Sequence, residues 1–132
     1  MNRAVNQPLL VSLSGEFEES DALALRGVVD ILARSRRWTV GPPQFIDEVD
    51  SSSCTAPEDE PVRTVGAVLE VTSPHSLPGT SREEATAFID GLAALSRERG
   101  LEMEVQLGNV YAGEIRAGVP DRLVREGLLA TW

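Results

Sequence analysis

The sequence predicts an α+β domain in which two helices lie on one face of a mainly antiparallel sheet. The main observation is a pattern of strand, amphipathic helix and strand that occurs twice, with apolar residues at strand spacing and then at helical spacing. A second observation is a polar, proline-containing connection between the two copies. The first copy comprises residues 9–17, 21–36 and 38–49, and the second comprises residues 62–72, 81–99 and 101–107.

In the first copy, apolar residues occupy every second position from Leu9 to Leu13, and the helix 21–36 has one apolar stripe. The strand that follows is interrupted by a glycine and two prolines at 41–43. Because proline cannot donate a ladder hydrogen bond, this strand is predicted to lie at a sheet edge or to contain a bulge.

In the second copy, the helix 81–99 begins with two overlapping capping boxes, at 80–83 and 81–84. Gly100 follows at the position where a left-handed C-terminal cap is expected. The strand 101–107 then alternates strictly between apolar and polar residues. Residues from both copies are expected in one core, namely Leu13, Leu25, Val29, Leu32, Leu69, Phe88, Leu92 and Val105.

The chain then turns back after Leu107, and the turn length decides which side chains face the core. A two-residue turn would direct Glu114 toward the core, whereas a three-residue turn, 108–110, pairs Leu107 with Tyr111 and puts the apolar residues on one face. Since a slip of one residue moves every side chain to the other face, the sequence predicts the three-residue turn.

The order of these elements resembles the ferredoxin-like split βαβ arrangement, βαββαβ. Two elements extend it, a hairpin strand, 110–117, and a short terminal helix, 122–126, that Asp121 would cap. All of residues 1–132 are expected to form a single domain. Proteins with this arrangement include enzymes, sensors and inhibitors, so the resemblance implies a fold and no activity.

The connection at 50–60 is rich in serine, proline and acidic residues, and we expect an exposed segment without regular structure. Cys54 lies within it and is expected to be a reactive thiol; as the single cysteine, it can form no intramolecular disulfide. No stretch reaches the ~20 apolar residues of a membrane span, and the first residues lack the apolar core of a signal peptide. These features favour a cytoplasmic location.

The charge balance excludes several functions. The chain has 21 acidic and 12 basic residues, a net charge of −9, and every basic residue is arginine. Nucleic acids and anionic membranes are therefore not expected as partners, because both attract clustered cations. Without lysine there is no Schiff-base or phosphate-loop lysine. The charge suits solubility or association with a basic protein surface.

Residues for catalysis or cofactor binding are few. The single histidine, His75, has no recognisable nucleophile near it in sequence, and one histidine with one cysteine cannot make a transition-metal site. No glycine-rich phosphate loop is present, so no cofactor is predicted. Glu102 and Glu104 lie ~7 Å apart on one strand face, a spacing that fits acid–base chemistry in a cleft but also an ordinary solvated face.

The leading functional hypothesis is a small acidic protein-binding module, in its sharpest form an inhibitor or immunity protein that covers a basic toxin or enzyme surface. One alternative is a small-molecule sensor or minor enzyme with a pocket between sheet and helices, where Gly66 and Gly113 would leave gaps for a ligand. Another is a structural subunit, and the oligomeric state is left open. The residues predicted to contact a basic partner are Asp47, Glu48, Asp50, Glu58, Asp59, Glu60, Glu102 and Glu104.

Overall fold

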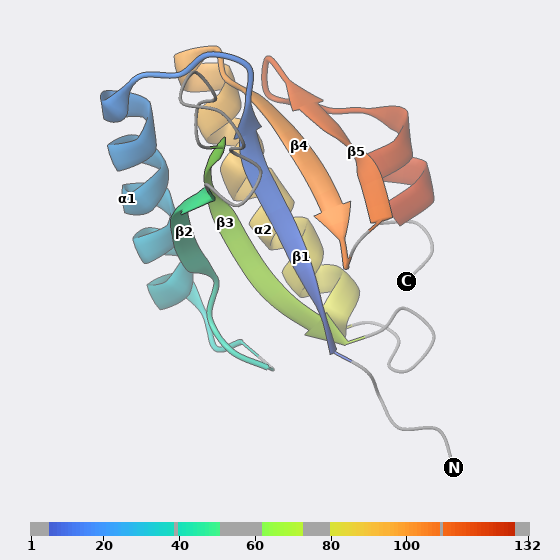
Figure 1. Cartoon of the computed structure of the whole chain (residues 1–132). Coiled ribbons are helices and arrows are strands. Elements are labelled where there is room, and N and C mark those ends of the chain that lie inside the picture. The colour runs from blue at the N-terminus through green and yellow to red at the C-terminus, as the bar shows by residue number, and fades with distance from the viewer. Residues whose placement is uncertain (1–5, 39, 51–61, 73–79, 109, 129–132) are drawn as a thin grey trace.

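The computed structural model describes residues 6–38, 40–50, 62–72, 80–108 and 110–128. They form an α+β structure with a six-stranded antiparallel sheet in the order β2-β3-β1-β4-β5-β6 (Figure 1). In chain order the elements are β1 (Asn6–Ser14), α1 (Glu19–Ser35), β2 (Gln44–Asp50), β3 (Val62–Thr72), α2 (Thr80–Arg99), β4 (Glu102–Leu107), β5 (Val110–Arg116), β6 (Val119–Pro120) and a short π-helix, η1 (Leu123–Leu128).

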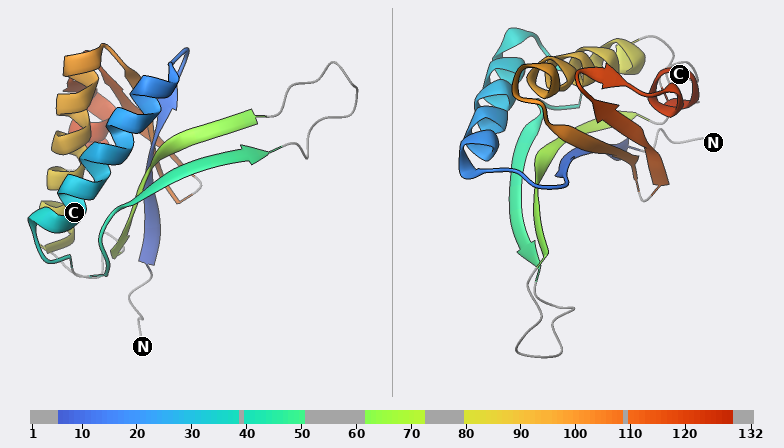
Figure 2. Two further views of the ribbon diagram at one scale, coloured as in Figure 1. Left: turned by 90° about the vertical axis from the view of Figure 1, so that its left-hand side faces the viewer. Right: turned by 90° about the horizontal axis from the view of Figure 1, so that it is seen from above.

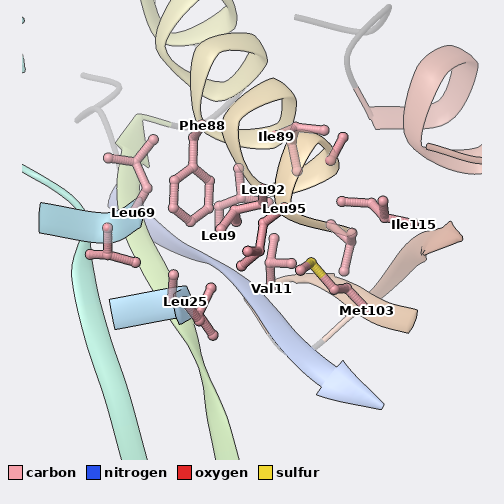
Figure 3. Close-up of a cluster of buried hydrophobic side chains, with 14 of the residues drawn as sticks. Leu9, Val11, Leu25, Leu69, Phe88, Ile89, Leu92, Leu95, Met103 and Ile115 are labelled. Atoms are coloured by element: carbon pink, nitrogen blue, oxygen red, sulfur yellow. The ribbon is translucent and has the colours of Figure 1, made fainter. Parts of the chain in front are cut away.

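Helices α1 and α2 lie side by side on the same face of the sheet, as predicted (Figure 2). Apolar side chains from alternate positions of β1, β3 and β4 meet the helices in one core, and Figure 3 shows Phe88, Ile89 and Leu92 of α2 pointing toward β1. Six of the eight predicted core residues are buried. The other two, Leu13 and Leu32, are half-buried and pack against the core.

Several element ends differ from the prediction. Strand β1 begins at Asn6 and ends at Ser14, so Phe17 belongs to the loop before α1. Strand β2 begins at Gln44, directly after the two prolines, and lies at the predicted sheet edge. Trp38 is therefore no strand residue; its side chain is buried, and its Nε1 donates to the Leu32 carbonyl at the end of α1.

Helix α2 ends as the sequence predicts. Gly100 has a φ of +65°, the left-handed conformation of a glycine cap. The buried Ser96 hydroxyl donates to the Leu101 carbonyl at 2.6 Å and accepts a hydrogen bond from the Gly118 amide. One serine thereby fixes both the start of β4 and the turn between β5 and β6.

The hairpin β4–β5 corrects the predicted turn. Leu107 pairs with Val110 and not with Tyr111, so the three-residue turn is wrong. A β-bulge then places Ala112 opposite no residue, and from Val105–Gly113 onward the pairs are those of the three-residue turn. From Gly113 onward the side chains therefore face as predicted, because the bulge supplies the one-residue shift. The prediction is wrong for Tyr111, which pairs with Gln106 and lies on the face opposite the helices, and for Ala112, which packs against the core.

Gly113 and Asp121 join this bulge to η1. Gly113 has a φ of +129°, and a Cβ built on it would lie 2.5 Å from Asp121 Oδ1 and 2.6 Å from Val124 Cγ2. Asp121 Oδ1 accepts from the Val124 amide, which confirms its predicted capping role. Its Oδ2 accepts from the Glu114 amide in β5, so the same carboxylate also holds η1 against the sheet.

Strands β2 and β3 continue beyond the rest of the sheet as a two-stranded arm (Figure 2). Residues 62–65 of β3 pair with β2, and pairing of β3 with β1 begins at Gly66, opposite Ser12. A Cβ on Gly66 would lie 2.4 Å from the Val11 carbonyl oxygen, so only glycine fits where β3 joins β1. Residues 51–61 lie outside the described residues, and with them the predictions for Cys54 and for the loop conformation.

Candidate protein-interaction surface

The sheet face opposite the helices, here called the open face, is not covered by any described helix or strand (Figure 2). Its residues follow from strand register, because residues paired across strands point to the same side. One row crosses the sheet as Gln44, Val68, Leu10, Gln106 and Tyr111, and the next crosses it as Ile46, Gly66, Ser12, Glu104 and Glu114.

The middle of the open face, on β1 and β3, is apolar, and this apolar surface continues onto the edge strand β2. Leu10 and Val68 lie in the middle and Ile46 lies on β2, and all three are half-buried although no described element packs over them. Tyr111 is 48% exposed at one end of the first row. Partial burial raises the pKa of the Tyr111 phenol, and the carboxylates of Glu114 and Asp121 add to the effect. The phenol therefore stays neutral and can donate a hydrogen bond.

Carboxylates surround this apolar middle. By register, Glu48, Glu70, Glu102, Glu104 and Glu114 all lie on the open face. Among the described residues, Arg116 is the one basic side chain of this face, and its Nη2 lies 2.6 Å from Glu114 Oε2. An apolar centre within a charged rim is the common anatomy of a protein interface.

The structure divides the predicted contact residues between different places. Glu48, Glu102 and Glu104 lie on the open face, whereas Asp47 is on the helix side of β2. Asp50 is the last residue of β2. The three consecutive acidic residues at 58–60, Glu58, Asp59 and Glu60, lie outside the described residues.

Other members of the open face were not singled out from the sequence. Leu10 and Ile46 look like ordinary strand residues, and Glu70 looks like an ordinary solvated one. The one available signal is Val68, an apolar residue at a position that alternation assigns to the polar side of β3. Only strand order shows that these residues gather on one surface.

Asp47 is bound by an arginine. Arg63 of β3 donates from Nε to Asp47 Oδ1 at 3.0 Å and from Nη2 to Asp47 Oδ2 at 2.8 Å. The same guanidinium also pairs with Glu19 in the first turn of α1 and lies 5.8 Å from the ring centre of Phe17. Arg63 thus ties the arm to the start of α1, and its hydrogen bonds hold the pKa of Asp47 and of Glu19 below their ordinary values.

Replacing Arg63 with glutamine is expected to raise both pKa values toward the ordinary range. In the wild type these depressed pKa values contribute stability above about pH 4, and the contribution is lost as the pH falls through the folded-state pKa. The variant should therefore lose less stability on acidification than the wild type. Carboxyl ¹³C shifts recorded against pH, together with urea unfolding at each pH, measure both effects.

Asp21 provides the internal control for this titration. Its pKa is lowered by hydrogen bonds from the Glu18 amide and from Arg99, not by Arg63. The Asp21 titration should be the same in the two proteins. Unchanged titration of both Asp47 and Glu19 in the Arg63→Gln variant would contradict the cluster.

A wide hollow of about 730 Å³ lies where the loop after β1 meets the end of α2. Two of its charged groups already bind each other, because Arg99 Nε donates to Asp21 Oδ1 at 2.8 Å. Arg99 Nη2 also donates to Ser20 Oγ at 3.2 Å. Its lining residues are Gly15, Glu16, Phe17, Glu18, Asp21, Arg99, Gly100 and Leu101. Glu102 and Glu104 are not among them, so this hollow does not contain the carboxylate pair that was considered for acid–base chemistry.

The gaps expected at two strand glycines are occupied by the chain itself. The space beside Gly66 holds the backbone of Val11 and Ser12, and the space beside Gly113 holds Asp121 and Val124. The expectation that a ligand approaches at these glycines is therefore wrong.

Two features are absent from the described residues. No three His, Cys, Asp or Glu side chains there form a group that could hold a metal ion. None of the described helices is both long and apolar enough to span a membrane.

Comparisons with other proteins identify no relative of this chain. No protein-family model, no curated protein and no solved structure matches it. A functional proposal for this chain therefore rests on the residues of the open face.

Proposed function

We propose that this protein is a small acidic protein-binding module that docks a basic partner on the open face of its sheet. The observation that carries the proposal is the half-buried apolar group Leu10, Ile46 and Val68 within a rim of glutamates. Docking would remove the apolar side chains from water, and cations on the partner would meet the rim carboxylates.

The charge of the rim also favours a different protein over a second copy of this chain. Glu104 and Glu114 already lie opposite each other within the sheet. Stacking two open faces would add further like-charge contacts, which are unfavourable at an interface. A basic partner would relieve this repulsion. In the sharpest form of the proposal the covered surface is the active region of a toxin or enzyme, and the module is its inhibitor or immunity protein.

We also propose that β1, α1, β2, β3, α2 and β4 form a ferredoxin-like split βαβ unit. The sheet order β2-β3-β1-β4 and the two helices on one face support this assignment. Strands β5 and β6 with η1 would then be an addition at one edge of that unit.

Neutralising the open face is expected to abolish partner capture. The face variant carries Glu102→Gln, Glu104→Gln and Glu114→Gln. The helix variant loses the same three charges at exposed helix positions, through Asp30→Asn, Asp90→Asn and Glu98→Gln. Each tagged protein is incubated with native-host lysate, and retained proteins are quantified by mass spectrometry. A partner should be retained by the wild type and the helix variant and lost from the face variant.

The identified partner is then purified and its association rate with each protein is measured against salt. The wild-type and helix-variant rates should exceed that of the face variant by about tenfold at low salt and fall steeply as salt rises. If the two variants bind equally well, or if the partner carries no basic surface, the open face is not the docking site.

A further inference from the structure

A second, smaller hollow of about 180 Å³ adjoins one corner of the open face. It lies between the segment that leads into β2 and the middle of β3. Val40, Pro42 and Val68 supply apolar walls, and Gln44 and Glu70 supply the polar groups. Its volume is below the range of about 300–1,000 Å³ that is typical of small-molecule sites, and it suits one long side chain.

Glu70 gives this hollow its charge. Its side chain is exposed, and it makes no hydrogen bond or ion pair within the part of the chain that the structure describes. None of the described residues that line the hollow is basic. Val68 belongs both to the hollow and to the apolar middle of the open face, so the two surfaces are continuous.

We propose that this hollow receives an arginine or lysine side chain of the partner that docks on the open face. The aliphatic stem of such a side chain would pack on Val40, Pro42 and Val68, and its cationic head would meet the Glu70 carboxylate. The Gln44 amide oxygen can accept a further hydrogen bond. The chemistry selects a side chain that is apolar along its length and positively charged at its tip.

This inference rests on the proposed function for its biological meaning, but its test requires no partner. The probe is n-butylguanidinium, titrated into the ¹⁵N-labelled full chain at low salt and followed by amide chemical shifts. Two related compounds separate the requirements: guanidinium ion lacks the stem, and n-butylurea lacks the charge. We expect saturable shifts at Gly41, Gln44 and Val68 with n-butylguanidinium, and weaker binding of both related compounds.

The matched variants are Glu70→Gln and Glu48→Gln. Both remove one exposed carboxylate from the open-face side of the β2–β3 pair, but Glu48 does not line the hollow. Glu70→Gln should weaken n-butylguanidinium binding about fivefold, whereas Glu48→Gln should leave it unchanged. Equal effects of the two variants, equal binding of n-butylurea, or the absence of saturable shifts would each overturn the inference. This test is independent of the partner-capture experiment, because the face variant used there retains Glu70 and the n-butylguanidinium titration uses no partner.

Discussion

Replacing Leu92 with alanine should lower the free energy of unfolding by about 2–5 kcal/mol, the range for a large-to-small change in a packed core. Leu92 is 0% exposed and lies on the face of α2 that meets the sheet, beside Leu95 and Leu9 (Figure 3). The substitution removes the apolar contacts of the side chain and leaves a cavity that α2 and β1 cannot close without disturbing neighbouring contacts. Urea unfolding followed by circular dichroism measures the change.

Leu23→Ala is the matched control for this experiment. It makes the same chemical change on the other helix, at a side chain that is 66% exposed, and should alter the free energy of unfolding by no more than about 0.5 kcal/mol. The m-value should stay the same in both variants, because each unfolds to a similarly exposed chain. Similar destabilisation at the two sites would contradict the assignment of the core face.

Gly113→Ala should be the other strongly destabilising substitution, lowering the free energy of unfolding by about 2–4 kcal/mol. Two costs combine at this position. A φ of +129° is strained for any residue with a Cβ, and the new methyl group would overlap Asp121 and Val124. Relief of the overlap requires η1 to move away from β5, which would break the hydrogen bond from the Glu114 amide to Asp121.

The control for this substitution is expected to have the opposite sign. Gly27 lies within α1, and a Cβ there would meet no atom within 4 Å. Gly27→Ala should therefore stabilise the protein by up to about 1 kcal/mol, since alanine loses less backbone entropy in a helix. Thermal unfolding of the two variants beside the wild type gives both signs in one experiment. A neutral Gly113→Ala variant would show that η1 does not pack against the bulge.

Most of the fold was predictable because its elements have strong local signals. The alternation in β3 and β4 and the apolar stripes of both helices identify these elements and the helix-bearing face. Boundaries failed where tertiary contacts decide them. Trp38 looks like the first residue of a strand, but its indole is buried against the end of α1, and the prolines delay β2 until Gln44.

In the hairpin, the face that each side chain occupies and the length of the turn are two separate predictions. Burial of apolar side chains predicts the faces correctly from Gly113 to Arg116, but not at Tyr111, which lies on the open face opposite Gln106. The turn itself was predicted wrongly, because the same pairs from Gly113 onward arise from a tight turn followed by an extra residue, Ala112. The glycine at 113 is the residue that permits this solution, since its φ is positive.

The candidate surface was only partly predictable. Acidic side chains at alternate strand positions can be read directly from the sequence, and Glu102 and Glu104 were found in this way. Their neighbours on the open face come from strands distant in the chain, so they emerge only when the order β3-β1-β4 is known. Asp47 was assigned to the partner surface from the sequence, but it is bound within the protein. The sequence does not show this, because its partner Arg63 is 16 positions away and occupies the next strand.

The central position of β1 has a consequence for how the chain folds. Leu9 pairs with Leu69 on one side and with Leu107 on the other, so both neighbours come from much later in the sequence. Contacts of such long range slow folding, because much chain entropy is lost before the contacts form. During synthesis β1 emerges before the other strands of the sheet, yet its second neighbour is available only after β4 has been made. Until then its apolar side chains lack part of their packing, and this interval is when the nascent chain is most exposed to aggregation.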